Sequence, residues 1–180
     1  MKKASTKRRT EETAATAVAH TPDVITSYNK LMAHAELVSV SLVRSSASFH
    51  AEHFGGEELA VHVDRPRMRG GFHTESRTLN CGALLSVKLV PKKLEGAGDA
   101  AHVDAEAVVD VEAEYGITYH IPDGVEVSDD LIQMFASRNA VFGAWPFFRE
   151  LAHSLVARMD MPPLVVPLFR MPPLPKAGTH

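Results

Sequence analysis

The 180-residue chain contains one cysteine, no long apolar run and no nucleotide-binding motif, and each absence excludes a class of protein. Cys81 alone cannot form an internal disulfide framework or a zinc site built on several cysteines. Together with the missing secretory pattern, it predicts a reducing, cytoplasmic environment. No window approaches the roughly 18 apolar residues of a spanning helix, so we expect no membrane insertion. G-x-S-x-G, P-loop and dinucleotide-binding motifs are absent, so we predict neither an enzyme nor a cofactor.

The formal net charge of −3 conceals an uneven distribution along the chain. Five basic residues and no acid stand in the first ten positions: Lys2, Lys3, Lys7, Arg8 and Arg9. Of the 19 basic residues, 14 remain in residues 11–180 beside all 22 acidic ones, a net of −8. A secretory signal would need an apolar run after Arg9, where polar residues stand, so we interpret residues 1–22 as a disordered basic leader. The alternative is a weak contact of this leader with nucleic acid or an acidic partner. The net charge of the whole chain is not basic, however, so we do not predict a nucleic-acid-binding protein.

Period-two alternation predicts four antiparallel strands, after a short helical segment at 24–35. The first strand covers 36–44 and extends to about residue 52 beyond a bulge. A short strand at 59–63 lies within a loop-rich, glycine-containing segment, 54–78. Residues 79–90 alternate clearly, and Cys81 falls on their apolar face, where we interpret it as a buried hydrophobe. The alternation over 103–121 is too long for one straight strand, so we expect it to bend or to begin within the preceding turn.

Helical spacing replaces the alternation after Pro122. Ser128 is a suitable N-cap for a short helix over 129–137. We expect Gly143 to interrupt the helix and Pro146 to open a second one, whose apolar face packs on the sheet or on a partner. From Pro162 onward, six of the eleven prolines produce an extended apolar strip that cannot be a central strand. We expect a Pro-rich disordered tail over 171–180, which leaves one domain over 23–170.

Ten histidines and a row of acids offer no clear catalytic or metal site. His50 and His53 would point to opposite faces of a strand, and no three-ligand spacing is visible, so we predict no metal. The arginines at 65, 67 and 69 cluster at a loop tip, where they keep the loop solvated or steer an acidic partner. Acidic residues occupy the even positions of the longest alternation: Asp104, Glu106, Asp110, Glu112 and Glu114. We interpret this row as a solvated face or a docking surface for a basic partner, since equivalent solvated carboxylates do not form a catalytic dyad.

Large apolar residues in glycine- and proline-flanked segments point to recognition of other polypeptides. The candidate binding residues are Phe54, Met68, Phe72, Trp145, Phe147, Met161, Leu164, Val166, Leu168 and Phe169. The alternative is that these side chains close the core or a subunit interface, and for Phe54, Phe72, Met161 and Phe169 the two interpretations are evenly balanced.

The segment over 144–151 begins Ala144-Trp145-Pro146-Phe147 and continues with Arg149-Glu150. Together with SLVARMDMPPLVVPLF over 154–169, it resembles the SecB family of export chaperones, which share an aromatic-Pro-aromatic helix start and a later Pro-Leu strip. The matching positions include Leu155-Val156, Arg158 and Pro163-Leu164. The resemblance implies an α+β, SecB-like fold, in which a C-terminal helix packs on a four-stranded antiparallel sheet.

The resemblance also implies an ATP-independent holdase that self-associates as a dimer or tetramer and binds unfolded clients over apolar grooves. In the family an acidic sheet face docks the SecA-type export motor. This chain departs from that pattern, because the prolines after Phe169 prevent the further C-terminal helix of export-type members. The Pro-rich end instead resembles SecB-like chaperones of toxin–antitoxin systems, which bind an apolar extension of an antitoxin. A non-chaperone oligomeric interaction module is the alternative function.

Overall fold

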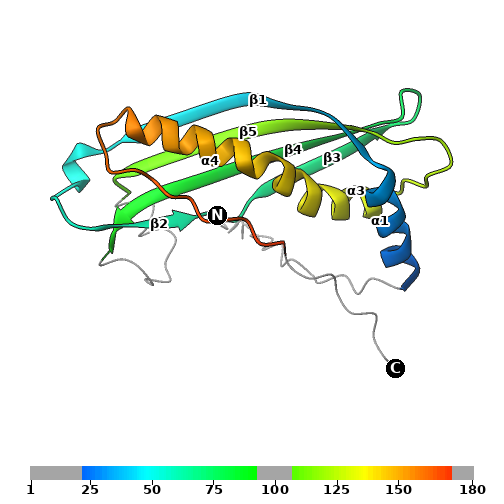
Figure 1. Ribbon diagram of the computed structural model, residues 1–180, viewed down its shortest axis with the longest axis horizontal. Helices are drawn as coiled ribbons and strands as arrows, with labels where there is room; N and C mark the ends of the chain where they lie inside the picture. The colour runs from blue at the N-terminus through cyan, green and yellow to red at the C-terminus, as the bar shows by residue number, and fades with distance from the viewer. Residues whose placement is uncertain (1–21, 93–106, 172–180) are drawn as a thin grey trace, which may run out of the picture.

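The computed structural model describes residues 22–92 and 107–171, and its centre is one antiparallel sheet (Figure 1). The strands are β1 (Glu36–Phe49), β2 (Leu59–Val63), β3 (Arg67–His73), β4 (Thr78–Pro91) and β5 (Val109–His120). Their order is β1-β5-β4-β2, and β3 also pairs with β4. The predicted α+β architecture with a C-terminal helix on the sheet is therefore confirmed, with five strands in place of four.

The two central strands follow the alternation seen in the sequence. In β4 the odd positions from Leu79 to Leu89 are buried, and in β5 those from Val109 to Tyr119 are buried. These side chains form one core with the helices on the same face. Their even-numbered neighbours lie on the opposite face, which we call the outer face. Residues 103–106, the predicted start of the last strand, lie outside the described residues.

The fifth strand lies where we expected a loop. β4 is long enough to pair with two short strands in succession, β3 over Thr78–Leu84 and β2 over Val87–Pro91. Gly70, in the segment that we predicted to be loop-rich, lies inside β3. A Cβ there would lie 2.7 Å from Cγ2 of Ile132, so the glycine allows the strand to approach the helix closely.

β1 forms the free edge of the sheet and pairs with β5 along its whole length. The register shifts between Leu37 and Ser39 and again between Leu42 and Arg44, which confirms the predicted bulge. Because the strand has a neighbour on one side only, nearly all of its residues are exposed or half-buried. The short 3-10 turn η1 (Ala51–His53) follows it.

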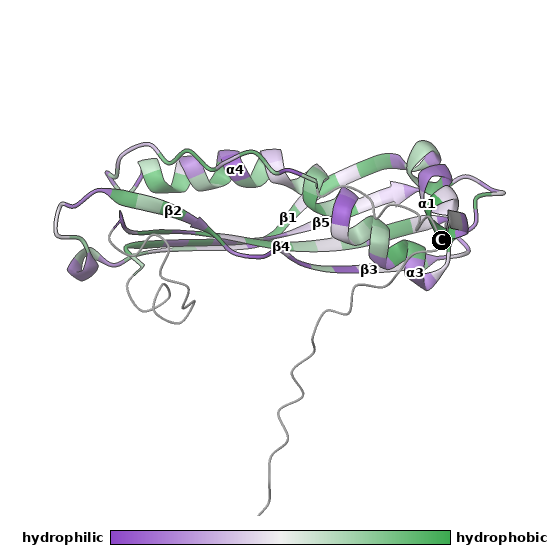
Figure 2. Ribbon diagram, turned by 90° about the horizontal axis from the view of Figure 1, so that it is seen from below, coloured by the Kyte–Doolittle hydropathy of each residue, from purple (hydrophilic) through white to green (hydrophobic). Residues whose placement is uncertain are grey.

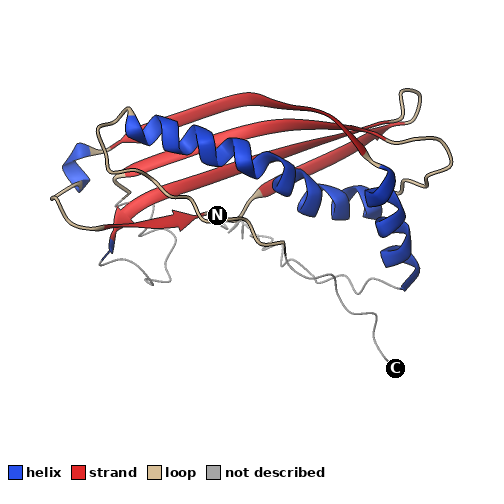
Figure 3. Cartoon of the chain, in the orientation of Figure 1, coloured by secondary structure: helices blue, strands red, loops and turns tan. Residues whose placement is uncertain are grey.

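The helices cover one face of the sheet. α1 (Pro22–His34) confirms the predicted leading helix and packs against α3 (Asp129–Phe135). Ser128 caps α3 as predicted, because its Oγ accepts a hydrogen bond from the Leu131 N–H. The π-helical segment η3 (Ala136–Ala140) joins α3 directly to α4 (Val141–Ala157), so that Figure 3 shows one long helical path.

Our expectation of a break near Gly143 and a new helix at Pro146 was wrong, because both residues lie inside α4. Pro146 removes the hydrogen bond to the carbonyl of Phe142, but both side chains lie on the exposed side of the helix, where water can satisfy that carbonyl. A Cβ at Gly143 would lie 3.2 Å from Oη of Tyr119, so this glycine brings the helix close to the sheet. Among the described helices, none is long and apolar enough to cross a membrane.

Candidate binding surfaces

Within residues 22–92 and 107–171, the structure provides no cluster of three or more metal-ligating side chains. Cys81 is buried on the helix-covered face of β4, and burial raises the pKa of its thiol to about 12. A thiol with that pKa stays protonated at neutral pH and is a poor nucleophile.

The apolar strip (residues 161–171) runs back along α4 and is attached to it through main-chain carbonyls (Figure 2). Trp145 Nε1 donates to the carbonyl of Pro167 at 2.9 Å, and Arg149 Nε donates to that of Val166 at 2.9 Å. His153 Nδ1 lies 3.1 Å from the carbonyl of Leu164 and donates when it carries the proton. Donors four residues apart share one side of a helix. This side of α4 thus contacts an extended chain along two helical turns.

Apolar contacts accompany these hydrogen bonds. The Trp145 ring lies 5.5 Å from the Phe169 ring and 5.7 Å from the Phe148 ring, measured between centroids. Leu164 and Val166 are buried in the core cluster together with Met161 at the start of the strip. The strip is therefore held by alternate apolar side chains as well as by its carbonyls.

The structure divides the predicted binding residues into three groups. Exposed side chains are Phe147 on α4 and Leu168 on the strip. Half-buried side chains are Phe54, Met68, Phe72 and Phe169. Fully buried side chains are Trp145, Met161, Leu164 and Val166, which contact the chain's own core. In the structure as it stands, only the first two groups can contact a partner.

Five of the exposed apolar side chains that we did not predict lie along β1: Leu37, Val38, Leu42, Val43 and Phe49. Others are Met32 on α1, Val61 on β2, Phe142 on α4 and Val165 on the strip. Leu37 and Leu42 pair with Tyr119 and Tyr115 and so share the helix-covered face. Val43 lies on the outer face, where a Cβ at Gly116 would be 3.4 Å from its Cγ2. A long edge strand with exposed apolar side chains and unpaired main-chain groups is a typical site for strand addition.

The missed signal was the pair of adjacent apolar residues at each bulge. Strict alternation buries one residue of a pair such as Leu42-Val43, but the bulge and the edge position expose both. Strand order depends on distant pairing, so alternation alone could not show that this strand has only one neighbour.

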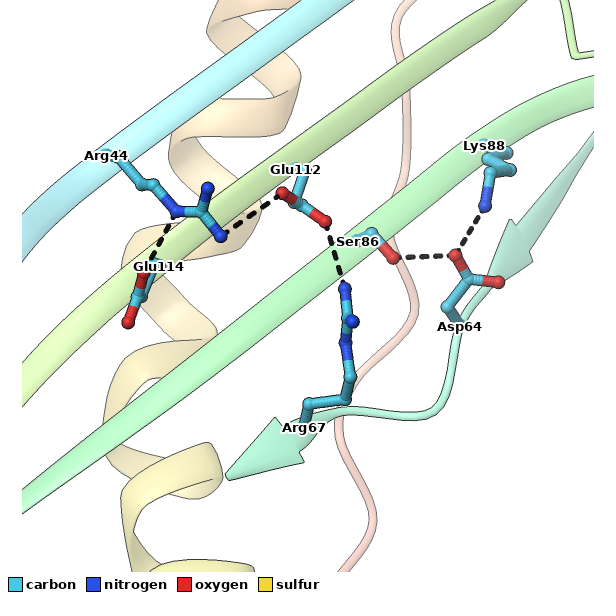
Figure 4. Close-up of polar contacts among 7 residues, drawn as sticks. All are labelled: Arg44, Asp64, Arg67, Ser86, Lys88, Glu112 and Glu114. Atoms are coloured by element: carbon cyan, nitrogen blue, oxygen red, sulfur yellow. Dashed lines mark hydrogen bonds and ion pairs between the residues drawn. The ribbon is translucent and has the colours of Figure 1, made fainter. Parts of the chain in front are cut away.

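Two residues of the predicted acidic face, Glu112 and Glu114, pair with arginines (Figure 4). Arg44 Nε lies 2.9 Å from Glu114 Oε2, and Arg67 Nη2 lies 3.3 Å from Glu112 Oε2. Arg69 also pairs with Glu114. The interpretation of these arginines as a loop-tip cluster was wrong for positions 67 and 69, which lie in β3. Asp104 and Glu106 lie outside the described residues, and Asp110 lies on the outer face beside Lys88.

A second polar cluster on the outer face surrounds Asp64. Lys88 Nζ and Ser86 Oγ each donate to Asp64 Oδ2 at 2.6 Å. Burial by itself would raise the Asp64 pKa, but these hydrogen bonds and the Lys88 charge outweigh it and hold the pKa below its usual range. An open depression of about 490 Å³ lies between this cluster and Glu112, and charges of both signs line it.

Comparison with known proteins assigns the fold. No protein-family profile and no curated protein matches the chain. Among solved structures, the SecB-like chaperone Rv1957 of Mycobacterium tuberculosis, in complex with a ChAD peptide from the Rv1956 HigA1 antitoxin, matches with a TM-score of 0.66. The match covers 82% of this chain and 99% of that one at 15% identity. A protein of unknown function from Streptococcus agalactiae matches with a TM-score of 0.38 at 11% identity, over 74% and 98% of the two chains, too weakly to support an argument. The chain therefore has a SecB-like fold.

Proposed function

We propose that this chain is an ATP-independent holdase chaperone that binds unfolded or aggregation-prone polypeptides through exposed apolar side chains. The observation that carries the proposal is the placement of exposed apolar residues on three separate elements of a SecB-like fold: β1, α4 and the strip. Several weak apolar contacts along one unfolded chain give affinity without sequence specificity. No catalytic group takes part in such binding.

The exposed and half-buried members of the predicted set are the contact residues of this proposal. Phe147 and Leu168 are accessible in the structure as it stands. Phe54, Met68, Phe72 and Phe169 are half-buried and offer a smaller area to a client. Of the four buried members, Trp145 can contact a client only when the strip leaves α4, and the other three belong to the strip itself.

The client is an export preprotein or an antitoxin, and two observations favour the antitoxin. The solved SecB-like neighbour contains an antitoxin peptide. In addition, Glu112 and Glu114 pair with arginines and do not form the free acidic face that a basic export motor would need. On these two observations we propose that the chain belongs with the toxin–antitoxin-associated chaperones, and we propose separately that it acts in the cytoplasm.

Self-association as a dimer or tetramer accompanies this function. β1 is a 14-residue edge strand with exposed apolar side chains, so pairing with a second copy would satisfy its unpaired main-chain groups. A non-chaperone oligomeric module would show the same association, so oligomer size alone does not separate the two functions.

Light scattering of a thermally unfolded protein, with excess chaperone and without nucleotide, tests the proposal. A holdase suppresses the aggregation and forms a larger complex that contains the client. An interaction module leaves both the aggregation and its own oligomer unchanged, and that result would overturn the proposal.

A further inference from the structure

The strip is an extended polypeptide segment bound to a surface of α4. Its carbonyls at Leu164, Val166 and Pro167 accept hydrogen bonds from three side chains that are spaced about one turn apart along two turns of the helix. Among the described residues, no backbone–backbone hydrogen bond joins the strip to the sheet or to a helix. The strip is thus attached as a bound peptide would be: side chains of α4 donate hydrogen bonds to its main-chain carbonyls, and its apolar side chains are buried.

The way α4 contacts the strip places few demands on sequence. Only carbonyl oxygens are used, and every residue, including proline, carries one. Alternate side chains enter the core, as Leu164 and Val166 do, while the intervening Val165 remains 73% exposed. Any extended segment with apolar residues at alternate positions can meet these requirements, and such segments are what an unfolded protein presents.

We infer that the strip is a built-in competitor for a client-binding site on α4, and that an extended apolar segment of a client displaces it. This inference rests on the proposed holdase function. It explains why four predicted binding residues, Trp145, Met161, Leu164 and Val166, are buried: they form an occupied site and its occupant. The donors of the site are Trp145, Arg149 and His153, and its apolar partners include Phe148.

Competition of this kind sets the apparent affinity for clients. A site that is free for only a fraction of the time binds its ligand more weakly by that fraction. A change that weakens the strip without altering α4 must therefore tighten client binding. A strip that served only as part of the core would show the opposite, because its loss would damage the site.

Adjacent valines offer a matched pair of variants. Val166 is 2% exposed and Val165 is 73% exposed, so V166A loosens the strip whereas V165A leaves its docking unchanged. Loss of two buried methyl groups shifts an equilibrium by about tenfold. The probe is a fluorescein-labelled peptide with the sequence of residues 161–171. Trp145 is the only tryptophan of the chain and its indole donates to the strip, so its emission reports whether the site is filled.

We expect V166A to bind the labelled peptide about tenfold more tightly than the parent or V165A in fluorescence anisotropy. Saturation with unlabelled peptide should return the V166A Trp145 emission to that of the parent. Equal affinities for the three proteins, or weaker binding by V166A, would overturn the inference.

Hydroxyl-radical footprinting on the unaltered protein provides a test that does not depend on a folded variant, because it reports the exposure of side chains. Binding of a carboxymethylated, permanently unfolded protein should make the buried strip residues Met161, Leu164 and Val166 react faster, and Phe148 of α4 no faster. Unchanged labelling of these strip residues when the unfolded protein is bound would contradict the inference. If no aggregation is suppressed by any of the three proteins, the holdase function itself fails. If all three suppress it and the peptide does not distinguish them, only the competitor is disproved.

Discussion

Phe147 and Phe148 are adjacent in α4, and variants at these two positions can distinguish an effect on client binding from an effect on stability. Phe148 is 0% exposed within the core, whereas Phe147 is 51% exposed. A phenylalanine side chain buries about 200 Å² when it is covered, so about 100 Å² of Phe147 remains for a client. At about 25 cal/mol per Å², covering that area contributes about 2.5 kcal/mol. This corresponds to an affinity change on the order of fifty-fold as an upper value.

We expect F147A to weaken binding of an unfolded client by up to this factor and to change the free energy of unfolding by less than about 1 kcal/mol. F148A, by contrast, should lower the free energy of unfolding by about 3–5 kcal/mol. Urea denaturation measures stability, and anisotropy with a labelled unfolded protein measures affinity. If F147A is as stable as the parent and binds the client equally well, Phe147 does not belong to the binding surface and the reasoning is refuted.

Three further variants test the sheet, and two of them have a matched control. G70V should lower the free energy of unfolding by about 1–3 kcal/mol in a urea titration, since its Cβ would collide with Ile132. G71V is the control: its Cβ would meet nothing within 4 Å, so the same titration should show little change. The Asp64 pKa lies below its ordinary 3.8 in the folded state, so the contribution of Asp64 to stability is present above the unfolded pKa and is lost as the pH falls through the folded pKa. D64N should therefore flatten the decline in the free energy of unfolding below about pH 4. Equal slopes of that free energy against pH in D64N and the parent would contradict this. V38K on the β1 edge should reduce self-association in analytical ultracentrifugation, whereas Q133K at an exposed position of α3 should not; an unchanged oligomer in V38K would exclude β1 as the interface.

Alternation in the sequence predicted β4 and β5 well because both strands have one buried face and one polar face. The physical cause is local, because alternation along a single strand is enough to assign each side chain to one face of the sheet. The use of glycine and proline as signals for loops and helix boundaries failed in the segment around Gly70 and at Gly143 and Pro146. At Gly70 the strand lies too close to Ile132 for a Cβ, and at Gly143 a Cβ would be a tight 3.2 Å from Oη of Tyr119; both contacts join residues far apart in the sequence.

The candidate binding residues were predicted by type but not by exposure. Apolar residues between prolines could equally face a partner or the core, and only the path of the strip along α4 decides this for Leu164 and Val166. The exposed residues of β1 were missed for the related reason that an edge is a property of strand order. Both errors arise from non-local packing, which a single sequence does not display.

β3, which Gly70 allows to pack closely against α3, also determines the charge of the outer face. β3 brings Arg67 and Arg69 to β4, and the absence of a side chain at Gly82 lets Arg69 cross that strand and reach Glu114. Exposed pairs of this kind add only about 0–1 kcal/mol each to stability, so their main effect is on the charge that a partner meets. With Arg44, these arginines cancel the two glutamates and remove the negative field that would steer a basic partner from a distance. Binding is therefore better supported on the apolar edge and on α4 than on the outer face.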